Sequence, residues 1–290
     1  MTHDRTFEVY SACPICGSRA ISDLWQVNRY TVARCQDCTN RFVRERLTLE
    51  ALFEHYASSE PSTYVDENSD WLKYYYSKAA KLVRSYHPTP GKILDIGCSR
   101  GWFFDEMTGW ECYGTEISSR DATAARERGN ATIFVGAFEE MPEREAFFDV
   151  ITMQDVLDHL IDPLESLKRV IRQLKPGGTL LIKVHDFSCL YARLSGSRFY
   201  AIIPPSHLFY YTRPGLRKLV ELAGFEPVAA RHIGNRLQIK TVFLRLARDN
   251  TKSLNHKIYQ WLGRTSAGNL HFIKNLHDII TLVARKPEER

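Results

Sequence analysis

Four cysteines near the N-terminus have the clearest chemistry in this sequence. They form two C-x2-C pairs, Cys13 with Cys16 and Cys35 with Cys38, with eighteen residues between the pairs. Four thiolates at this spacing are the ligand set of a tetrahedral structural zinc site. The alternatives are disulfides, which an intracellular chain disfavours, and a redox dithiol, which needs only one pair beside a βαβ unit. We therefore expect the four cysteines to hold one Zn²⁺ with no open coordination position.

A glycine turn after residue 90 is the second candidate site. It reads DIGCSRGW over residues 95–102 and leads from an expected strand into an expected helix, so that backbone N–H groups face an anionic ligand. Trp102 stands where a dinucleotide fingerprint has a small residue, which argues against a pyrophosphate site. Glu116, 19 positions beyond Gly97, ends the next strand and can accept hydrogen bonds from both hydroxyls of a ribose. The turn and Glu116 together predict a nucleoside site; the alternative is that Glu116 is an exposed strand-end charge.

The elements that would position these residues follow from the apolar pattern. After residue 91, short apolar runs alternate with helical segments, which is typical of a parallel sheet with crossover helices. The runs cover 92–97, 112–117, 132–136, 148–153, 179–184, 225–233 and 278–286, and helices are expected from 48, over 70–86, from 162 to 175 and over 212–223. This predicts an α/β fold: a Rossmann-like, seven-stranded, mostly parallel sheet with flanking helices, plus a small N-terminal zinc-binding module.

With these motifs the chain resembles the class I methyltransferases that use S-adenosylmethionine (SAM), from about Lys92 to Lys286. Residues 95–101 look like their first motif, D-x-G-x-[G/S]-x-G, and YGTEI at 113–117 looks like their acidic second-strand motif. Residues 148–184 resemble their fourth through fifth strands. The segment PPSHLFYYTRPGLRKLVELAGFE, at 204–226, is similar to one in the branch that often carries an N-terminal cysteine cluster and acts on sugars, glycans and other small molecules.

The resemblance implies a domain division and a set of cofactor contacts. It implies a zinc-binding module over 1–46, a helical linker or lid over 47–90, and a SAM-dependent methyltransferase domain over 91–290 with a basic helical insertion at about 236–272. Gly97, Ser99 and Gly101 would line the methionine part of SAM, with Asp95 orienting its amino group. Glu116 would hold the ribose, Ala137 and Phe138 would flank the adenine, and Met153 would also lie at the cofactor. The family frequently has Asp at position 137, so backbone groups at Phe138 would have to bond the adenine here.

Two histidines are candidates for removing a proton from the methyl acceptor, a task suited to imidazole at neutral pH. His159 follows the fourth strand, beside the expected methyl position, and a pocket-shaping role is its alternative. His207 precedes the helix that closes the domain, where the similar sugar C-methyltransferases often have Glu-His and this chain has Ser206-His207. Transfer to a sugar hydroxyl and transfer to a sugar carbon therefore both remain open. Packing or capping of the next turn is the alternative role of His207.

Several other functions are disfavoured. Residues 153–156 read MQDV, not the Asn/Asp-Pro-Pro-aromatic turn of enzymes that methylate exocyclic base amines, and the Pro-Cys turn of cytosine C5 enzymes is absent. The leading hypothesis is thus a small-molecule or glycan methyltransferase. The alternative is an RNA-modifying enzyme that binds phosphates through the zinc module and basic C-terminal region, although nucleic acid is the less favoured partner. A non-catalytic SAM-binding scaffold is disfavoured by the intact glycine turn.

Composition supports an ordinary globular chain. Of 290 residues, 44% are hydrophobic and 25% charged, with a net charge of +5. No segment approaches the roughly 20 consecutive apolar residues of a membrane-spanning helix, and no apolar signal stretch follows the start, so we expect a cytoplasmic protein. Residues 231–290 hold 12 Lys/Arg against 4 Asp/Glu. This region is a candidate for peripheral membrane contact, or it is simply a solvated surface.

Overall fold

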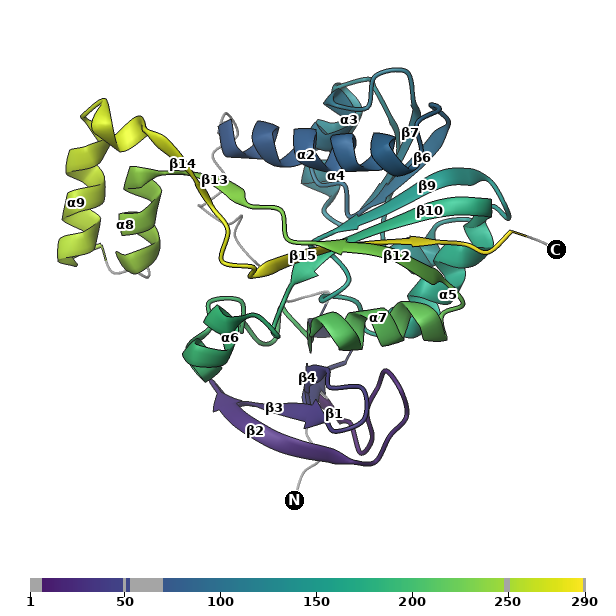
Figure 1. Ribbon diagram of the computed structural model, residues 1–290, viewed down its shortest axis with the longest axis horizontal. Helices are drawn as coiled ribbons and strands as arrows, with labels where there is room; N and C mark the ends of the chain where they lie inside the picture. Colours follow the sequence, from purple (N-terminus) through teal and green to yellow (C-terminus); the bar gives the residue numbers. More distant parts are fainter. Residues whose placement is uncertain (1–6, 49–50, 53–69, 248–250, 289–290) are drawn as a thin grey trace.

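A seven-stranded sheet organises the computed structural model, which describes residues 7–48, 51–52, 70–247 and 251–288 (Figure 1). The strand order is β12-β15-β10-β9-β6-β7-β8, and among these strands β15 alone runs antiparallel to its neighbours. The strands are β6 (Lys92–Ile96), β7 (Glu111–Glu116), β8 (Thr132–Val135), β9 (Phe148–Gln154), β10 (Leu174–His185), β12 (Glu226–Arg231) and β15 (Ile279–Arg285). The predicted Rossmann-like, mostly parallel sheet is therefore confirmed.

Helices cover both faces of this sheet. On one face lie α2 (Asp70–Tyr86), α3 (Trp102–Asp105) and α4 (Ser119–Glu127), and on the other lie α5 (Pro163–Gln173) and α7 (Arg213–Leu222) (Figure 1). The strands alternate between the two cores: Ile93 packs with the first group of helices, whereas Leu94 packs with the second. Helices begin where the sequence places N-caps, since the side chains of Asp162 and Thr212 accept hydrogen bonds from backbone amides at the starts of α5 and α7.

The cysteine-rich module shares a sheet with the large domain. Its strands β2 (Ile21–Val27), β3 (Tyr30–Cys35) and β4 (Arg41–Val43) are extended by β11 (Phe209–Tyr210), which pairs antiparallel with β4. The small strands β1 (Phe7–Val9) and β5 (Glu45–Leu47) pair with each other beside it. The module therefore contributes to the same hydrophobic core as α5 and α7, through residues such as Ile15 and Phe42.

Residues 235–274 form an arm that projects from the sheet. It contains the two-stranded ribbon of β13 (Asn235–Gln238) and β14 (His271–Lys274), and between them α8 (Ile239–Ala247) and α9 (Leu254–Gly263) (Figure 1). The sequence predicted a basic helical insertion at about 236–272 but not the ribbon. The helix expected from Thr48 falls mostly outside the described residues.

No helix in the described parts of the chain is long and apolar enough to cross a membrane. A short helix, α6 (Leu190–Ser195), follows β10.

Candidate active site

The glycine turn lies at the carboxyl end of β6. Gly97 and Gly101 have φ angles of +70° and +75°, a region that side chains disfavour. A Cβ atom on Gly97 would also lie 2.4 Å from Cγ2 of Val156, so any other residue there would require the Val156 side chain to move. The expected helix after the turn is α3, which has only four residues. The turn thus presents backbone to the space beyond β6.

Glu116, at the end of β7, is tied to this turn by its carboxylate. Its Oε2 accepts a hydrogen bond from the backbone amide of Ser99 at 2.9 Å, and its Oε1 accepts one from the amide of Ser118 at 2.8 Å. Burial raises the pKa of Glu116, and the two amide hydrogen bonds act against that rise. Each carboxylate oxygen has a second lone-pair direction, so both oxygens can accept a further donor such as a ribose hydroxyl.

A cavity of about 840 Å³ extends from these residues. Gly97, Glu116, Ala137, Phe138 and His159 lie on its wall, together with Ile117, Asp155, Val156 and, from the N-terminal module, Glu8, Arg46 and Leu52. This size is in the usual range for a cofactor pocket. The wall combines the half-buried Glu116 carboxylate with apolar residues such as Ile117 and Phe138, which suits a nucleoside.

Four of the expected cofactor residues are not on the described lining of the cavity: Asp95, Ser99, Gly101 and Met153. Asp95 is buried on β6, where its Oδ1 accepts hydrogen bonds from the Thr152 hydroxyl at 2.5 Å and the Gln154 amide at 3.4 Å. Burial raises its pKa to about 7, against the opposing effect of these donors. Met153 is fully buried in the hydrophobic core.

Beyond the cavity wall at His159 lies a cluster of three histidines around Asp158. The rings of His159 and His207 meet edge to face, with centroids 4.7 Å apart. Asp158 Oδ2 lies 3.7 Å from Nδ1 of His207 and 3.9 Å from Nδ1 of His185, both longer than a hydrogen bond. Asp158, His159 and His207 each have one atom that could bind a metal ion, and these three atoms lie within 4.8 Å of one another. The structure therefore brings the two expected histidines together, with His159 at the cavity and His207 behind it.

Backbone carbonyls fix the tautomers of these two histidines. Nδ1 of His159 lies 2.8 Å from the carbonyl oxygen of Ser206, and Nδ1 of His207 lies 2.8 Å from that of Ala201. A carbonyl oxygen only accepts, so each Nδ1 carries the hydrogen and each neutral ring has its lone pair on Nε2.

Burial and neighbouring charges have opposite effects on the pKa values of His207 and Asp158. Burial lowers the pKa of His207 to about 4, more than the nearby Asp158 carboxylate raises it. Burial raises the pKa of Asp158, but the surrounding His159, His207 and His185 outweigh this effect and hold that pKa well below its usual range. At neutral pH the cluster therefore contains an ionised carboxylate beside a neutral His207.

Sequence reasoning missed several polar residues at the same edge. Asp155, directly after β9, lies on the cavity wall with φ +57°, and its Oδ2 is 2.5 Å from Nζ of Lys183 and 3.1 Å from the hydroxyl of Tyr75. His185 and Asp158 were missed as well. One signal could have found them: Asp155, Asp158 and His185 all follow or end the central strands, and parallel strands bring their carboxyl ends to one edge.

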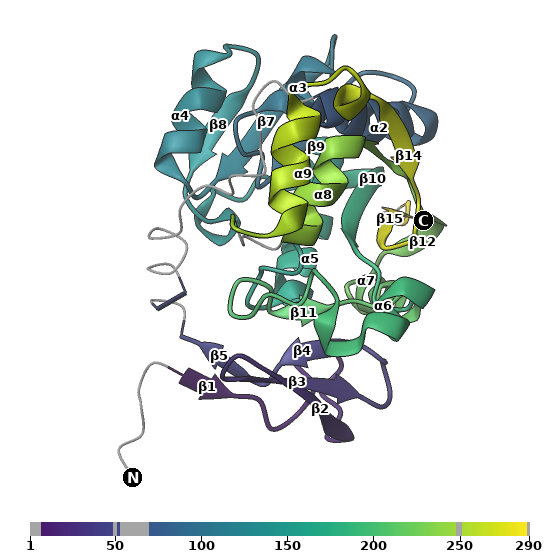
Figure 2. The same cartoon turned by 90° about the vertical axis from the view of Figure 1, so that its left-hand side faces the viewer.

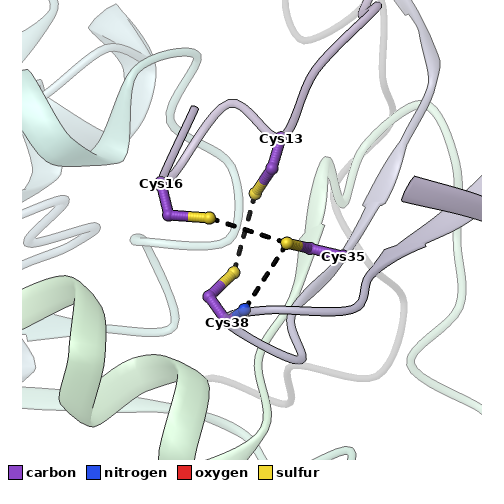
Figure 3. Close-up of side chains that lie close together, drawn as sticks. All are labelled: Cys13, Cys16, Cys35 and Cys38. Carbon is purple, nitrogen blue, oxygen red and sulfur yellow. Dashed lines mark hydrogen bonds between the residues drawn. The ribbon is translucent and has the colours of Figure 1, made fainter. Parts of the chain in front are cut away.

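The four cysteines lie close together in the N-terminal module (Figure 3). Sγ of Cys13 lies 3.6 Å from Sγ of Cys38, and Sγ of Cys16 lies 3.6 Å from Sγ of Cys35. A disulfide would bring sulfurs to about 2.05 Å, whereas four thiolates about 2.3 Å from one zinc ion are separated by roughly 3.8 Å. The backbone amides of Ile15 and Cys38 point at sulfurs of Cys13 and Cys35, at 3.4 and 3.5 Å. The donor set therefore fits a tetrahedral metal ion.

Comparison with known proteins identifies the large domain. The family described as "Methyltransferase domain" matches residues 69–230, more than half of the chain. The chain belongs to this methyltransferase family. Its fold and relatives support a SAM-dependent methyltransferase.

Relatives of this methyltransferase have several stated functions. It is 28% identical over 150 residues to a tRNA U34 carboxymethyltransferase of Desulfotalea psychrophila, covering 48% of this chain and 44% of the relative. It is 29% identical over 125 residues to a ubiquinone biosynthesis O-methyltransferase of Aliivibrio fischeri, covering 40% and 51%. The chain thus spans about half the length of these curated relatives.

Solved structures show the same fold at low sequence identity. The PH0226 protein of Pyrococcus horikoshii matches with a TM-score of 0.54 and 20% identity, over 81% of this chain and 99% of that one. Phosphoethanolamine N-methyltransferase 2 of Haemonchus contortus, in complex with SAM, matches with a TM-score of 0.51 and 14% identity, over 92% and 71%. These likenesses support the methyltransferase fold alone.

Proposed function

We propose that this methyltransferase transfers a methyl group from SAM to a small-molecule or glycan acceptor, at a sugar hydroxyl or a sugar carbon. The observation that carries the proposal is the position of the histidine pair: His159 lies on the wall of the cavity that holds Glu116, and the ring of His207 packs against it. An imidazole nitrogen next to the cavity proposed for SAM, the methyl donor, can remove a proton from the acceptor.

The expected cofactor residues would divide the parts of SAM between them. Glu116 would accept hydrogen bonds from the ribose hydroxyls, and Ala137 with Phe138 would contact the adenine. Gly97, Ser99 and Gly101 would leave room for the methionine part. Asp95, buried on β6, would orient the amino group of the methionine part. SAM supplies the electrophilic methyl group, and the protein supplies orientation and a water-poor site.

Proton removal would occur at the histidine pair. Because the carbonyls of Ser206 and Ala201 hold hydrogen on both Nδ1 atoms, Nε2 is the atom of either ring that can take the acceptor's proton. The ionised Asp158 would stabilise the resulting imidazolium, since opposite charges attract strongly in a buried setting. His207 is our first candidate for the base and His159 our second.

The four cysteines would hold Zn²⁺ as a structural ion. A closed shell of four thiolates leaves no coordination position for an acceptor, so the metal would stabilise the module and take no part in the reaction. This role agrees with the burial of Cys13, Cys35 and Cys38 within the shared core.

Transfer to RNA is the second candidate, supported by the relative named as a tRNA U34 carboxymethyltransferase. Incubation of the enzyme and methyl-labelled SAM with fractionated cell extract separates the two. We expect label in the saccharide or small-molecule fraction, insensitive to ribonuclease. Label that appears only in RNA, and disappears after ribonuclease treatment, would contradict the proposal.

A further inference from the structure

The arm leaves the sheet at the edge that carries the cofactor cavity. Strand β12 ends at Arg231, which pairs with Thr281, and β15 begins at Ile279, which pairs with His185 at the end of β10. The parallel strands β6, β7 and β9 end at this same edge, where Gly97 and Glu116 line the cavity. The arm therefore emerges beside the active site, and Figure 1 shows α8 and α9 standing away from the sheet on that side.

Helix α9 exposes a mixed apolar and basic stripe. Leu254, Lys257, Trp261 and Arg264 are all exposed, with 72% of Leu254 and 64% of Trp261 accessible to solvent. Their spacing of three, four and three residues places them on one side of the helix. Leu262, on another side, is buried, so the stripe is not the face by which α9 is held to the rest of the arm.

Helix α6 adds a second exposed apolar pair next to the arm. Leu190 and Leu194, four residues apart, are 67% and 79% accessible, and Arg193 between them is exposed. Figures 1 and 2 place α6, α8 and α9 on the same side of the molecule.

Polar contacts join the α6 region to the base of the arm. Oδ2 of Asp278 accepts a hydrogen bond from the hydroxyl of Tyr200 at 2.8 Å and forms an ion pair with Nζ of Lys274 at 2.6 Å. The same ammonium lies over the rings of Tyr191 and Tyr200, at 5.7 and 5.3 Å. Side chains of the α6 segment and of β14 are therefore held together at the base of the arm.

The sequence of the arm is basic, which favours an anionic partner. Residues 236–272 contain 7 Lys/Arg and 1 Asp. Helices that combine exposed Leu and Trp with Lys and Arg bind at the interface of anionic membranes, where the apolar side chains enter the acyl boundary and the cations meet phosphates. We propose that the α9 stripe and the exposed residues of α6 dock this methyltransferase onto an anionic lipid bilayer, with the cofactor edge of the sheet next to the membrane.

Two other partners fit the surface less well. RNA contacts cations with its phosphates and stacks its bases on aromatic rings, which leaves the aliphatic Leu190, Leu194 and Leu254 without a role. A symmetric dimer through α9 would collect Lys257 and Arg264 of both copies in one interface, and α9 has no acidic side chain to pair with them. Combined with the proposed function, membrane docking implies an acceptor that is itself held at the membrane, such as a lipid-linked saccharide.

Vesicle co-flotation tests the docking without any acceptor. The full-length protein is mixed with vesicles of phosphatidylcholine alone, or of phosphatidylcholine with about one third phosphatidylglycerol. We expect at least about tenfold tighter binding to the anionic vesicles, weakened by added salt. Leu254→Ser with Trp261→Ser, and separately Lys257→Glu with Arg264→Glu, should each reduce binding about tenfold or more. Leu222→Ser on α7 and Arg120→Glu on α4 are matched exposed controls that should bind like the wild type.

Circular dichroism and SAM titration of each variant separate docking from folding. A variant that keeps its fold and SAM affinity but loses vesicle binding supports the proposal. Absence of wild-type binding to anionic vesicles, or equal binding to both vesicle types, would overturn it. So would a stable wild-type dimer, or tight binding of total RNA, that the α9 substitutions abolish. None of these results depends on the methyl acceptor, so a wrong acceptor class would leave the docking result unchanged.

Discussion

The backbone amide of Val43, five residues after Cys38, donates a hydrogen bond to the carbonyl oxygen of Leu208, the residue after His207, at 2.9 Å. The amide of Leu208 in turn donates to the carbonyl oxygen of Asp158 at 2.8 Å. The cysteine module, the histidine segment and the buried carboxylate are therefore joined by consecutive backbone hydrogen bonds. Loss of order at the cysteines should therefore also reduce the order of the histidine segment at the active site.

The first prediction concerns the metal and this connection. We expect about one zinc per chain by elemental analysis, because the four thiolates close a tetrahedral shell. Cys35→Ser with Cys38→Ser should remove the metal and speed hydrogen exchange of the amides over 207–212, because β11 would lose its ordered partner strand. Cys112→Ser, which changes a cysteine outside the cluster, should alter neither result. Metal far below one per chain in protein prepared without chelator, or metal retained by the double variant, would refute the zinc assignment.

The second prediction concerns proton removal. With the acceptor found by label transfer, His207→Ala should lower turnover by about 10²–10⁴-fold, the usual contribution of a general base, while SAM affinity stays unchanged. The acid limb of the wild-type pH–rate profile should lie well below pH 6.5, because burial lowers the pKa of His207 to about 4. If His207→Asn loses less than tenfold in rate and keeps the same acid limb, the base is another group, with His159 the next candidate.

The third prediction concerns stability in acid. The pKa of His207 is about 4 in the folded protein and near 6.5 in an unfolded chain, so between these values the unfolded state binds the extra proton. The free energy of unfolding should therefore fall as the pH decreases from about 6.5 to about 4, by up to about 1.4 kcal/mol per pH unit from this residue. Asp158, whose pKa is also lowered on folding, should add a further loss below about pH 4.

Urea unfolding measured between these pH values checks the third prediction. His207→Asn should flatten the dependence of the unfolding free energy on pH, whatever its effect on stability at pH 7. His232→Asn is the matched control, because His232 pairs with Asp186 and not with the cluster. An identical pH slope in wild type and His207→Asn would show that His207 titrates alike in the folded and unfolded chains.

The sheet was predictable because its signals are local and repeated. The run at 92–96 and the glycine turn that follows it define β6, and helix α2 occupies the expected 70–86. The proximity of Glu116 to Ser99 followed from the same rule, since adjacent parallel strands end at one edge. In these cases short-range periodicity and one topological rule were sufficient.

The parts that escaped prediction depend on contacts between distant segments. Strand β11 has two residues, Phe209 and Tyr210, and so carries no periodicity, yet it pairs with β4 near the other end of the chain. Asp158 and His185 come close to each other only because β9 and β10 are neighbouring strands in the folded sheet. Burial, which lowers the pKa of His207, likewise arises from packing that one sequence does not display.

The central claim is that the cavity at Glu116 binds SAM, and calorimetric titration tests it most directly. The wild type should bind SAM at one site, and Glu116→Ala should weaken binding by about 1.5–3 kcal/mol, the range for hydrogen bonds to a charged group. Glu111→Ala, at the opposite end of the same strand, is the control that should bind like the wild type. Equal SAM affinity in the wild type and Glu116→Ala would contradict this placement of the cofactor.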